Sequence, residues 1–375
     1  MTHICFVIND YNFLLTHRLD LLENLANSFK VSVICNIKNI DKDKVILAEK
    51  ANINIIQINK RNGLFDSFRY KKDLLIKLNS QFSHIFFVTL EQSFFGALLA
   101  KKILKQKKYF VLSGLGHNFF KKNIKNRSIK ILQRLFFRLA FKKNLVSGVI
   151  FQNIHDSYEF KSFQNIFLTP EYIIKGNGIN VDKFPYMERN FQEFHFCYTG
   201  RLVKSKGINK LIEAYDYLSK KYLNMKFHLS ICGIYDESDH DSIDINTLKK
   251  LENSESISLY RNVVHTKVLQ ILKQANIFIL PSVREGISKS ALEAASTGMP
   301  ILAADNPGTC EVVKNRVNGL IYSDKNNLGL NLALEEIISL SEGELIKYGR
   351  SSREFIESTF SLKQITREYL DVIRQ

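Results

Sequence analysis

The stretch from Ile277 to Gly298, IFILPSVREGISKSALEAASTG, contains an apolar run, a polar loop and a helical pattern, in that order. The run Ile277–Leu280 is apolar throughout, as expected of a strand that is buried on both faces. We expect the helix to begin after Ser288, whose hydroxyl can cap its first turn, and to end just before Gly298. A strand, a loop and a helix make half of a βαβ unit, so this stretch predicts a parallel sheet.

The same alternation runs along the whole chain. The predicted strands are 4–8, 31–35, 53–58, 84–88, 109–112, 148–151 and 172–174, then, after a polar break near 187–190, 194–198, 227–231, 257–259, 277–280, 300–304 and 319–322. Two such series in 375 residues predict an α/β protein with two doubly wound parallel-sheet domains that face a central cleft. We place the domains at 1–186 and 187–357. A helical segment, 358–375, is expected to pack on a domain face, with the N-terminal domain as a candidate.

Composition indicates a soluble or peripheral protein. Hydrophobic residues make up 45% of the chain and charged residues 24%, which is ordinary for a globular protein. The five cysteines form no C-x-x-C pair, so neither a disulfide framework nor a zinc site is expected. No leader precedes the first strand and no apolar run is long enough to span a membrane, which favours the cytoplasm.

The net charge of +16 lies in one half of the chain. Up to Tyr186 there are 29 Lys and Arg against 13 Asp and Glu, an excess of 16, and the remainder is balanced. No carboxylate occurs between Glu91 and Asp156. A charge confined in this way predicts an anionic surface as partner, either a membrane or a nucleic acid.

The loop before Ser288 is a candidate phosphate site. The free N–H groups at a helix start attract anions, and Gly286 allows close approach of the backbone to a ligand. Glu285 and Glu293 lie eight residues apart, at most about 12 Å along a helix, which suits gripping two ends of an elongated ligand. Alternatively, the two glutamates are solvated helix carboxylates.

A second candidate follows the strand near Tyr198, where the chain reads YTGRLVKSKG up to Gly207. Arg201 and Lys206 on a strand-to-helix turn suit a diphosphate, because Arg offers a fork of donors and Lys a point charge. An exposed basic turn without a ligand is the alternative.

These two stretches, together with KGNGINVDKF (175–184), closely resemble the group 1 (family 4) glycosyltransferases of the GT-B fold. Further motifs follow in the family's order: GMPI (298–301), PGTCEVV (307–313) and NGL (318–320). The resemblance is dense from about 172 to 325 and looser before that. It implies an enzyme that transfers a sugar with retention of configuration, without a metal or other cofactor.

The resemblance also implies roles for individual residues. Arg201 and Lys206 would bind the donor diphosphate, Glu293 the ribose and Glu285 the transferred sugar. Substrate contacts are further implied for Gly200, Asn177, Gly286, Ile287 and Ser288. Asp239-His240-Asp241 looks like a metal-binding pair of aspartates, but it lies in an acidic, polar loop and is expected to be solvated.

The first half departs from the family in its loops. The usual glycine-rich loop after the first strand is missing, and the chain has His17 and Arg18 at the start of the first helix. There they either face the cleft or are ordinary helix residues without a binding role. Gly116 and His117 resemble the G-L-G loop of members that build bacterial surface glycans, with the histidine shifted. His117 could contact the sugar or be an ordinary loop histidine.

A basic, aromatic-rich segment from Lys101 to Lys143 completes the first half. Its part 127–143 could form a helix with apolar and basic faces, a pattern typical of membrane interfaces. A packed helix with a solvated basic side is the alternative. In the family the first domain takes the acceptor, so we expect a polyprenyl-diphosphate-linked glycan there, at the inner face of the plasma membrane.

The resulting hypothesis is a hexosyltransferase of bacterial surface polysaccharide synthesis, acting on O-antigen, capsule or lipopolysaccharide. Its donor would be a UDP-hexose or UDP-N-acetylhexosamine. A nucleotide-sugar epimerase or another GT-B enzyme remains an alternative. A nucleic-acid-binding protein is disfavoured because no RNP, helix-turn-helix or zinc signature occurs. An oxidoreductase would need G-x-G-x-x-G after a first strand, and neither domain supplies it.

Overall fold

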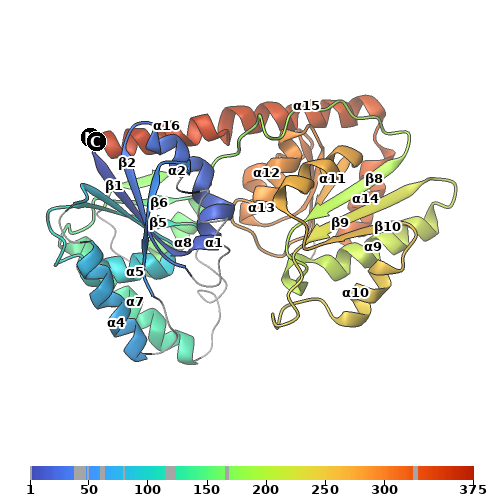
Figure 1. Ribbon diagram of the computed structural model, residues 1–375. Coiled ribbons are helices and arrows are strands. Elements are labelled where there is room, and N and C mark those ends of the chain that lie inside the picture. The colour runs from blue at the N-terminus through green and yellow to red at the C-terminus, as the bar shows by residue number, and fades with distance from the viewer. Residues whose placement is uncertain are drawn as a thin grey trace. The chain divides into compact units, whose positions relative to one another are not determined.

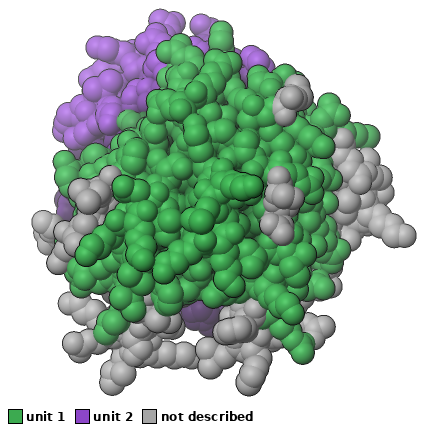
Figure 2. Space-filling model, turned by 90° about the vertical axis from the view of Figure 1, so that its left-hand side faces the viewer, with its two compact units in different colours: residues 1–178, 362–375 green, residues 179–361 purple. Residues whose placement is uncertain are grey.

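A computed structural model describes residues 2–37, 48, 50–59, 64–78, 81–114, 124–164, 169–323 and 328–375. The chain forms two compact units, coloured green and purple in Figure 2. Unit 1 comprises Met1–Gly178 and Leu362–Gln375, and unit 2 comprises Ile179–Ser361. The sequence placed the divisions after 186 and 357, so the observed crossings lie a few residues away from both.

Unit 1 is built on a seven-stranded sheet with the order β3-β2-β1-β4-β5-β6-β7, in which all pairs are parallel. Its strands are β1 (His3–Asp10), β2 (Lys30–Asn36), β3 (Ile53–Gln57), β4 (His84–Val88), β5 (Lys107–Leu112), β6 (Gly148–Phe151) and β7 (Glu171–Ile173). Its helices are α1 (Tyr11–Phe13), η1 (Leu14–Arg18), α2 (Leu19–Ala26), α4 (Leu64–Lys77), α5 (Leu90–Leu99), α7 (Ile124–Lys142), α8 (Ile154–Gln164) and α16 (Leu362–Arg374). Figure 1 shows α4, α5 and α7 on one face of this sheet and α2 and α16 on the other.

The central strands of this sheet are buried on both faces, whereas the edge strands β3 and β7 are partly exposed. In β1, Ile4, Phe6 and Ile8 pack with α2 and α16, whereas Cys5 and Val7 pack with the helices of the opposite face. Residues that alternate between two apolar layers give a continuous apolar run in sequence. This is why the strands could be predicted.

Unit 2 contains a six-stranded parallel sheet with the order β10-β9-β8-β11-β12-β13. Its strands are β8 (Phe194–Thr199), β9 (Phe227–Gly233), β10 (Ile257–Arg261), β11 (Ile277–Leu280), β12 (Ile301–Ala304) and β13 (Gly319–Tyr322). Its helices are η2 (Lys204–Lys206), α9 (Ile208–Lys221), α10 (Ile245–Glu252), η3 (His265–Lys267), α11 (Val268–Gln274), α12 (Lys289–Ser296), α13 (Pro307–Val312), α14 (Gly329–Ser339) and α15 (Glu342–Thr359).

Both sheets are doubly wound, as predicted. Strand order reverses between β1 and β4 in unit 1 and between β8 and β11 in unit 2. Ligands of open parallel sheets bind outside the carboxyl ends of the strands at such a switch point. Ligand sites are therefore expected at the loops that follow these four strands.

The C-terminal helix α16 belongs to unit 1. It buries Ile365, Tyr369 and Val372 in the core beside β1 and α2. The Tyr369 ring lies 6.4 Å from Phe6 and 6.1 Å from Phe86, centroid to centroid. The last helix thus completes a core that the first residues of the chain begin.

Four of the five cysteines are buried core residues, as the sequence indicated, and Cys310 is half-buried. All five are free thiols. Burial raises the pKa of Cys232 to about 11, so its thiol stays protonated near neutrality. None of the described helices combines the length and the apolar character that a bilayer crossing requires.

Candidate functional site

Two loops meet at the switch point of unit 2. The loop after β8 ends at Gly207, whose φ of +76° is left-handed, and a Cβ there would lie 2.2 Å from the carbonyl oxygen of Pro281 in the loop after β11. The backbone N–H of Val283 donates to the carbonyl of Ser205 at 3.3 Å. Only glycine allows this approach of the two backbones, so the local sequence fixes the two loops against each other.

Lys206 and Glu285, both candidates from the sequence, form an ion pair across these loops. Lys206 Nζ lies 2.6 Å from Glu285 Oε1, with the side chains 22% and 11% exposed. Ser282 Oγ donates to the same oxygen at 2.7 Å. Oε1 of Glu285 thus accepts hydrogen bonds from both Lys206 and Ser282. Among the described residues Oε2 has no hydrogen-bond partner, so it can accept a hydrogen bond from a ligand hydroxyl.

The loop that carries Glu285 is held by the start of α13. A Cβ on Gly308 would lie 2.0 Å from the carbonyl oxygen of Gly286 and 2.3 Å from that of Glu285. Asn306, the capping residue of α13, donates from Nδ2 to the carbonyl of Ser282 at 2.9 Å. Backbone contacts on both sides therefore set the position of the Glu285 carboxylate.

Arg201 lies exposed at the end of β8, beyond Gly200. The backbone there is held by Tyr198, whose buried hydroxyl donates to the carbonyl of Arg201 at 2.9 Å. Burial, and then the negative charge of Glu285, keep the pKa of Tyr198 above its ordinary value, so the hydroxyl remains a donor. The backbone of Arg201 is thus fixed, and its side chain is 59% exposed.

The acidic loop after β9 was expected to be solvated, and this expectation was wrong. Asp239 and Asp241 are not simply solvated: Asp239 Oδ2 lies 3.5 Å from Arg201 Nη1, and Asp241 accepts a short hydrogen bond from Ser205 Oγ. The backbone N–H of Lys204 also donates to the carbonyl of Asp241 at 2.7 Å. The loop is therefore bound to the basic turn that carries Arg201 and Lys206.

The start of α12 is formed as predicted. Ser288 caps the helix and its Oγ accepts from the N–H of Ala291 at 3.4 Å, while Gly298 follows the end with a left-handed φ of +84°. Ile287 and Gly286 lie half-buried just before the cap. Their backbone groups stand at the positive end of the helix dipole, which favours a bound anion.

Glu293 lies near the middle of α12 and is buried. Its Oε1 lies 2.8 Å from His265 Nε2 and 3.8 Å from Lys289 Nζ. His265 follows β10 and is more than half exposed. A buried carboxylate with two cationic or hydrogen-bonding neighbours is fixed in place, as a residue that contacts a ribose would need to be.

The structure brings together eight predicted residues on loops at the carboxyl ends of the unit 2 strands: Gly200, Arg201, Lys206, Glu285, Gly286, Ile287, Ser288 and Glu293. Three structural neighbours were missed: His265, Ser282 and Asn306. Their only signal in the sequence is that each follows a predicted strand. From that signal alone, the three residues could have been predicted to lie at the same edge of the sheet.

The remaining candidates belong to unit 1. His17 is exposed, stacks on Phe13 with ring centroids 4.9 Å apart, and shares a 2.6 Å hydrogen bond with Thr16. Asn177 is half-buried in the segment that leaves unit 1, and its Oδ1 is buried without a hydrogen-bond partner. Gly116 and His117 lie outside the described residues.

Arg18 differs from expectation. It does not face a ligand cleft but is fully buried, and its Nη1 donates to the hydroxyl of Tyr369 on α16 at 3.0 Å. Residues Leu14–Arg18 form a wide helical turn, which rotates Arg18 toward the core. The residue therefore joins the first helix to the last.

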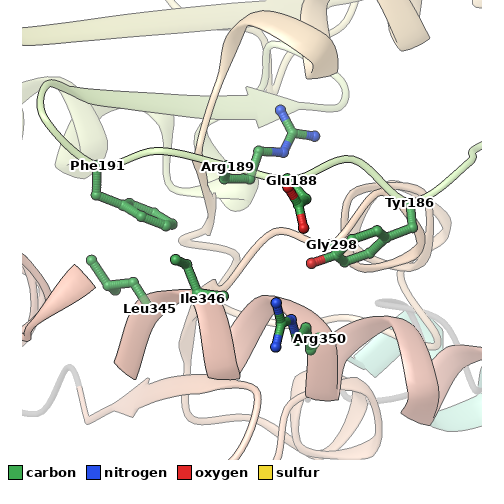
Figure 3. A pocket seen from close by; sticks show the side chains of 8 residues that line it. All are labelled: Tyr186, Glu188, Arg189, Phe191, Gly298, Leu345, Ile346 and Arg350. Carbon is green, nitrogen blue, oxygen red and sulfur yellow. The ribbon is translucent and has the colours of Figure 1, made fainter. Parts of the chain in front are cut away.

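Two pockets of unit 2 lie apart from this edge. One, of about 100 Å³, is lined by Tyr186, Glu188 and Arg350 among others (Figure 3). The other, of about 620 Å³, lies at the opposite ends of β8 and β9 and includes His195 and His228. Burial, and then the neighbouring His228, lower the pKa of His195 to about 4, so this pair stays neutral near neutrality. Neither pocket contains a predicted site residue.

Comparison with solved structures identifies the fold. Over the whole chain the fold is similar to that of sucrose-phosphate synthase from Thermosynechococcus elongatus, with a TM-score of 0.79 and 14% identity over 100% of this chain and 99% of that one. Anabaena HepE, solved in complex with UDP and glucose, gives a TM-score of 0.75 and 14% identity over 100% of both chains. The fold of this protein is therefore the GT-B fold, as predicted.

The sequence comparison agrees with the motifs. Residues 186–353 match the family model of the group 1 glycosyl transferases, the family that the motifs resemble. An uncharacterized glycosyltransferase of Methanocaldococcus jannaschii is 27% identical over 86% of this chain and 80% of its own length.

Two bacterial relatives carry more specific names. The capsular polysaccharide biosynthesis glycosyltransferase CapM of Staphylococcus aureus is 27% identical over 51% of each chain. The N,N'-diacetylbacillosaminyl-diphospho-undecaprenol alpha-1,3-N-acetylgalactosaminyltransferase of Campylobacter jejuni is 26% identical over 75% of this chain and 73% of its own.

Proposed function

We propose that the protein transfers a hexose or N-acetylhexosamine from a nucleotide diphosphate donor, a UDP-sugar in the first instance, to a lipid-linked glycan of bacterial surface polysaccharide synthesis. The observation that carries the proposal is the convergence of Arg201, Lys206, Glu285 and the start of α12 at the switch point of unit 2. The HepE complex with UDP and glucose supports a UDP-linked donor.

The donor would lie along this edge. Arg201 and Lys206 would bind the diphosphate together with the N–H groups at the start of α12, and Glu293 would accept from the ribose hydroxyls. Oε2 of Glu285, which the described residues leave unused, would accept a hydrogen bond from a hydroxyl of the transferred sugar. The spacing of two carboxylates on either side of a cationic centre suits an elongated, doubly charged ligand.

The reaction would proceed with retention and without a metal ion. The leaving diphosphate gains charge as the glycosidic bond breaks, and one of its oxygens takes the proton of the acceptor hydroxyl. Arg201, Lys206 and the helix start are preorganised to stabilise that charge, which is the largest contribution a protein can make to such a step. Activity in the presence of a chelator would test the absence of a metal requirement.

A screen of nucleotide sugars by thermal shift tests the donor proposal. A UDP-sugar should raise the melting temperature more than UDP alone, and incubation with glycolipid acceptors should then yield a lengthened glycan with retained configuration. An isomerised donor without a glycan product would point to an epimerase instead. No shift with any nucleotide sugar would contradict the proposal.

The acidic loop that carries Asp239 predicts how a substitution changes the affinity for the donor nucleotide. Asp239 adds negative charge beside Arg201, so Asp239→Asn should strengthen binding of UDP by about two- to fivefold, the range of a surface ion pair. Isothermal titration calorimetry at low salt would measure this. Glu237→Gln, an exposed carboxylate on the same loop, is the matched control; weaker binding by Asp239→Asn would show that the aspartate positions Arg201 instead.

We further propose that unit 1 faces an anionic membrane at the cytoplasmic side and takes the lipid-linked acceptor. Unit 1 carries 31 Lys and Arg against 14 Asp and Glu, whereas unit 2 carries 22 against 23. The C. jejuni relative, whose name includes an undecaprenol diphosphate, supports such an acceptor. Cationic side chains near an anionic leaflet each contribute about 1 kcal/mol.

Helix α7 is the surface proposed to contact the membrane. Ile131, Leu135 and Leu139 are 63%, 51% and 40% exposed at intervals of four residues, so they share one face of the helix. Phe137 and Phe141 are buried on the other face against Phe110 of the sheet. An apolar row left exposed beside basic residues fits the headgroup boundary of a bilayer.

Leu135→Glu should weaken binding to phosphatidylglycerol-containing vesicles by about tenfold, because it removes apolar area and adds a repelled charge. Leu223→Glu, an equally drastic change at an exposed leucine of unit 2, should leave binding unchanged. Co-sedimentation at low and high salt gives both values. Equal binding of the two variants, or indifference of the native protein to lipid charge, would refute the membrane proposal.

A further inference from the structure

The hydrogen bond between His265 and Glu293 joins a residue that the motifs did not indicate to one that they did. Glu293 lies on α12, whereas His265 is the first residue of η3, which follows β10 at the edge of the unit 2 sheet. His265 Nε2 lies 2.8 Å from Glu293 Oε1, although the two residues are 28 positions apart in sequence. The loop after β10 therefore reaches the carboxylate that we assign to the donor ribose.

Protein groups satisfy the Glu293 carboxylate only in part. Its side chain is 4% exposed, and Lys289 Nζ lies 3.8 Å from Oε1, beyond hydrogen-bond distance. Among the described residues, His265 is the one hydrogen-bond donor to this carboxylate, and Oε2 has no partner. In so buried a side chain, a carboxylate oxygen without a donor is costly, and a ligand hydroxyl can supply the missing hydrogen bond.

The carboxylate partner determines which nitrogen of His265 carries the proton. A carboxylate accepts hydrogen bonds, and Nε2 is the ring nitrogen beside it, so the proton lies on Nε2. Nε2 donates in this way in the neutral ring and in the protonated ring alike. The contact therefore needs a fixed N–H group and not a positive charge, and the side-chain amide of a glutamine can replace it.

The His265 ring rests against an aromatic side chain that is itself held in place. It packs edge to face on Phe184, with ring centroids 6.0 Å apart and planes at 66°. Phe184 is buried, and its carbonyl accepts from Ser296 Oγ at 2.9 Å and from Arg353 Nη1 at 2.8 Å. This contact restricts rotation of the imidazole, although the His265 side chain is 57% exposed.

The backbone on both sides of His265 is fixed as well. The N–H of Val268 donates to the carbonyl of His265 and closes the turn of η3. Before His265, the N–H of Asn262 donates to the carbonyl of Gly233 at 2.8 Å, and Asn262 Oδ1 accepts from the N–H of Tyr235 at 2.9 Å. The loop after β10 is thus tied to the loop after β9, and the Nε2–H group of His265 has a defined position.

We propose that His265 is a positioning residue for the donor: it holds Oε1 of Glu293, so that Oε2 is presented to the ribose hydroxyls, and it thereby makes the site select nucleotides that carry these hydroxyls. The inference rests on the proposed function, which places the ribose at Glu293. A carboxylate that is already held loses less rotational freedom when a hydroxyl binds, so the pair binds ribose more tightly than Glu293 alone. A histidine with only a structural role would affect the binding of every nucleotide alike.

The test uses isothermal titration calorimetry of the full chain with UDP and with 2′,3′-dideoxy-UDP, which lacks both ribose hydroxyls. His265→Ala should bind UDP about tenfold more weakly than the native protein does, as expected for the loss of one hydrogen bond to a charged group. Its affinity for the dideoxy analogue should be unchanged. His265→Gln keeps an N–H donor and should bind UDP within about threefold of the native affinity. Thr266→Ala, at an exposed residue of the same turn, is the matched control and should bind both nucleotides as the native protein does.

The pair of nucleotides separates a positioning role from a structural one. Equal weakening of UDP and dideoxy-UDP binding in His265→Ala, native UDP affinity of that variant, or no rescue by His265→Gln would overturn the inference and leave the proposed donor site standing. The same comparison applies to whichever of UDP, ADP, GDP and CDP the native protein binds best. Failure of the native protein to bind any of the four would contradict the proposed function, and this inference with it.

Discussion

Replacement of Lys206 by alanine should lower kcat about a hundred- to a thousandfold, the loss typical when one preorganised charge-stabilising group is removed. The ammonium group is 2.6 Å from Glu285 and stands at the loop where the diphosphate is proposed to leave. The protein should remain folded, since Glu285 keeps the hydrogen bond from Ser282. Steady-state kinetics with the donor identified by the screen, together with circular dichroism, would measure both effects.

Lys204 provides the matched control for this experiment. It lies on the same turn, is exposed, and carries the same charge, so Lys204→Ala should retain nearly full kcat. Glu285→Ala should lose activity as Lys206→Ala does, because the two side chains act as a pair. Full activity in folded Lys206→Ala and Glu285→Ala would refute the assignment of this edge as the active site.

Gly308→Ala should impair both stability and activity. A methyl group there would lie 2.0 and 2.3 Å from two backbone carbonyl oxygens, and backbone cannot rotate aside as a side chain can. Relief of this overlap must displace the Glu285–Gly286 loop, at a cost of about 1–3 kcal/mol in the free energy of unfolding. We expect kcat to fall at least about tenfold, since a shift of 1 Å in a positioning loop can cost a hundredfold.

Gly343→Ala is the control that separates the effect of Gly308→Ala from the effect of adding a methyl group elsewhere in the chain. It lies in the first turn of α15, and a Cβ there would meet no atom within 4 Å. Gly343→Ala should therefore keep full activity and gain up to about 1 kcal/mol in stability from reduced chain entropy. Thermal melts and kinetics of both variants make the comparison, and native behaviour of Gly308→Ala would show that α13 does not hold the loop.

The fold could be predicted because the central strands of both sheets are buried on both faces. Residues such as Phe196, Cys197 and Tyr198 alternate between two apolar layers, and the resulting run is visible without any tertiary information. The boundary between the two units was harder to predict from the sequence. It depends on where the chain crosses at Gly178–Ile179, and the polar stretch KGNGIN (175–180) that contains this crossing was interpreted as a family motif instead of a linker.

The strands, loops and helix starts of the candidate site could be predicted from the sequence, but the contacts between its side chains could not. Ser288 could be recognised as a cap because capping is local in sequence. The ion pair of Lys206 with Glu285 joins residues 79 positions apart, and nothing in either loop specifies the partner. The same holds for Asp239 beside Arg201, where a loop read as solvated is bound across the sheet edge.

The location of α16 has a consequence for the order of events during synthesis. Unit 2 is one continuous segment, Ile179–Ser361, and contains its whole core once that segment has left the ribosome. Unit 1 must wait for Ile365, Tyr369 and Val372, so its first half emerges early and cannot close its apolar face until α16 has been synthesised. The nascent N-terminal half therefore exposes that face longest, and a chain cut short before Leu362 should aggregate through unit 1 although unit 2 is complete.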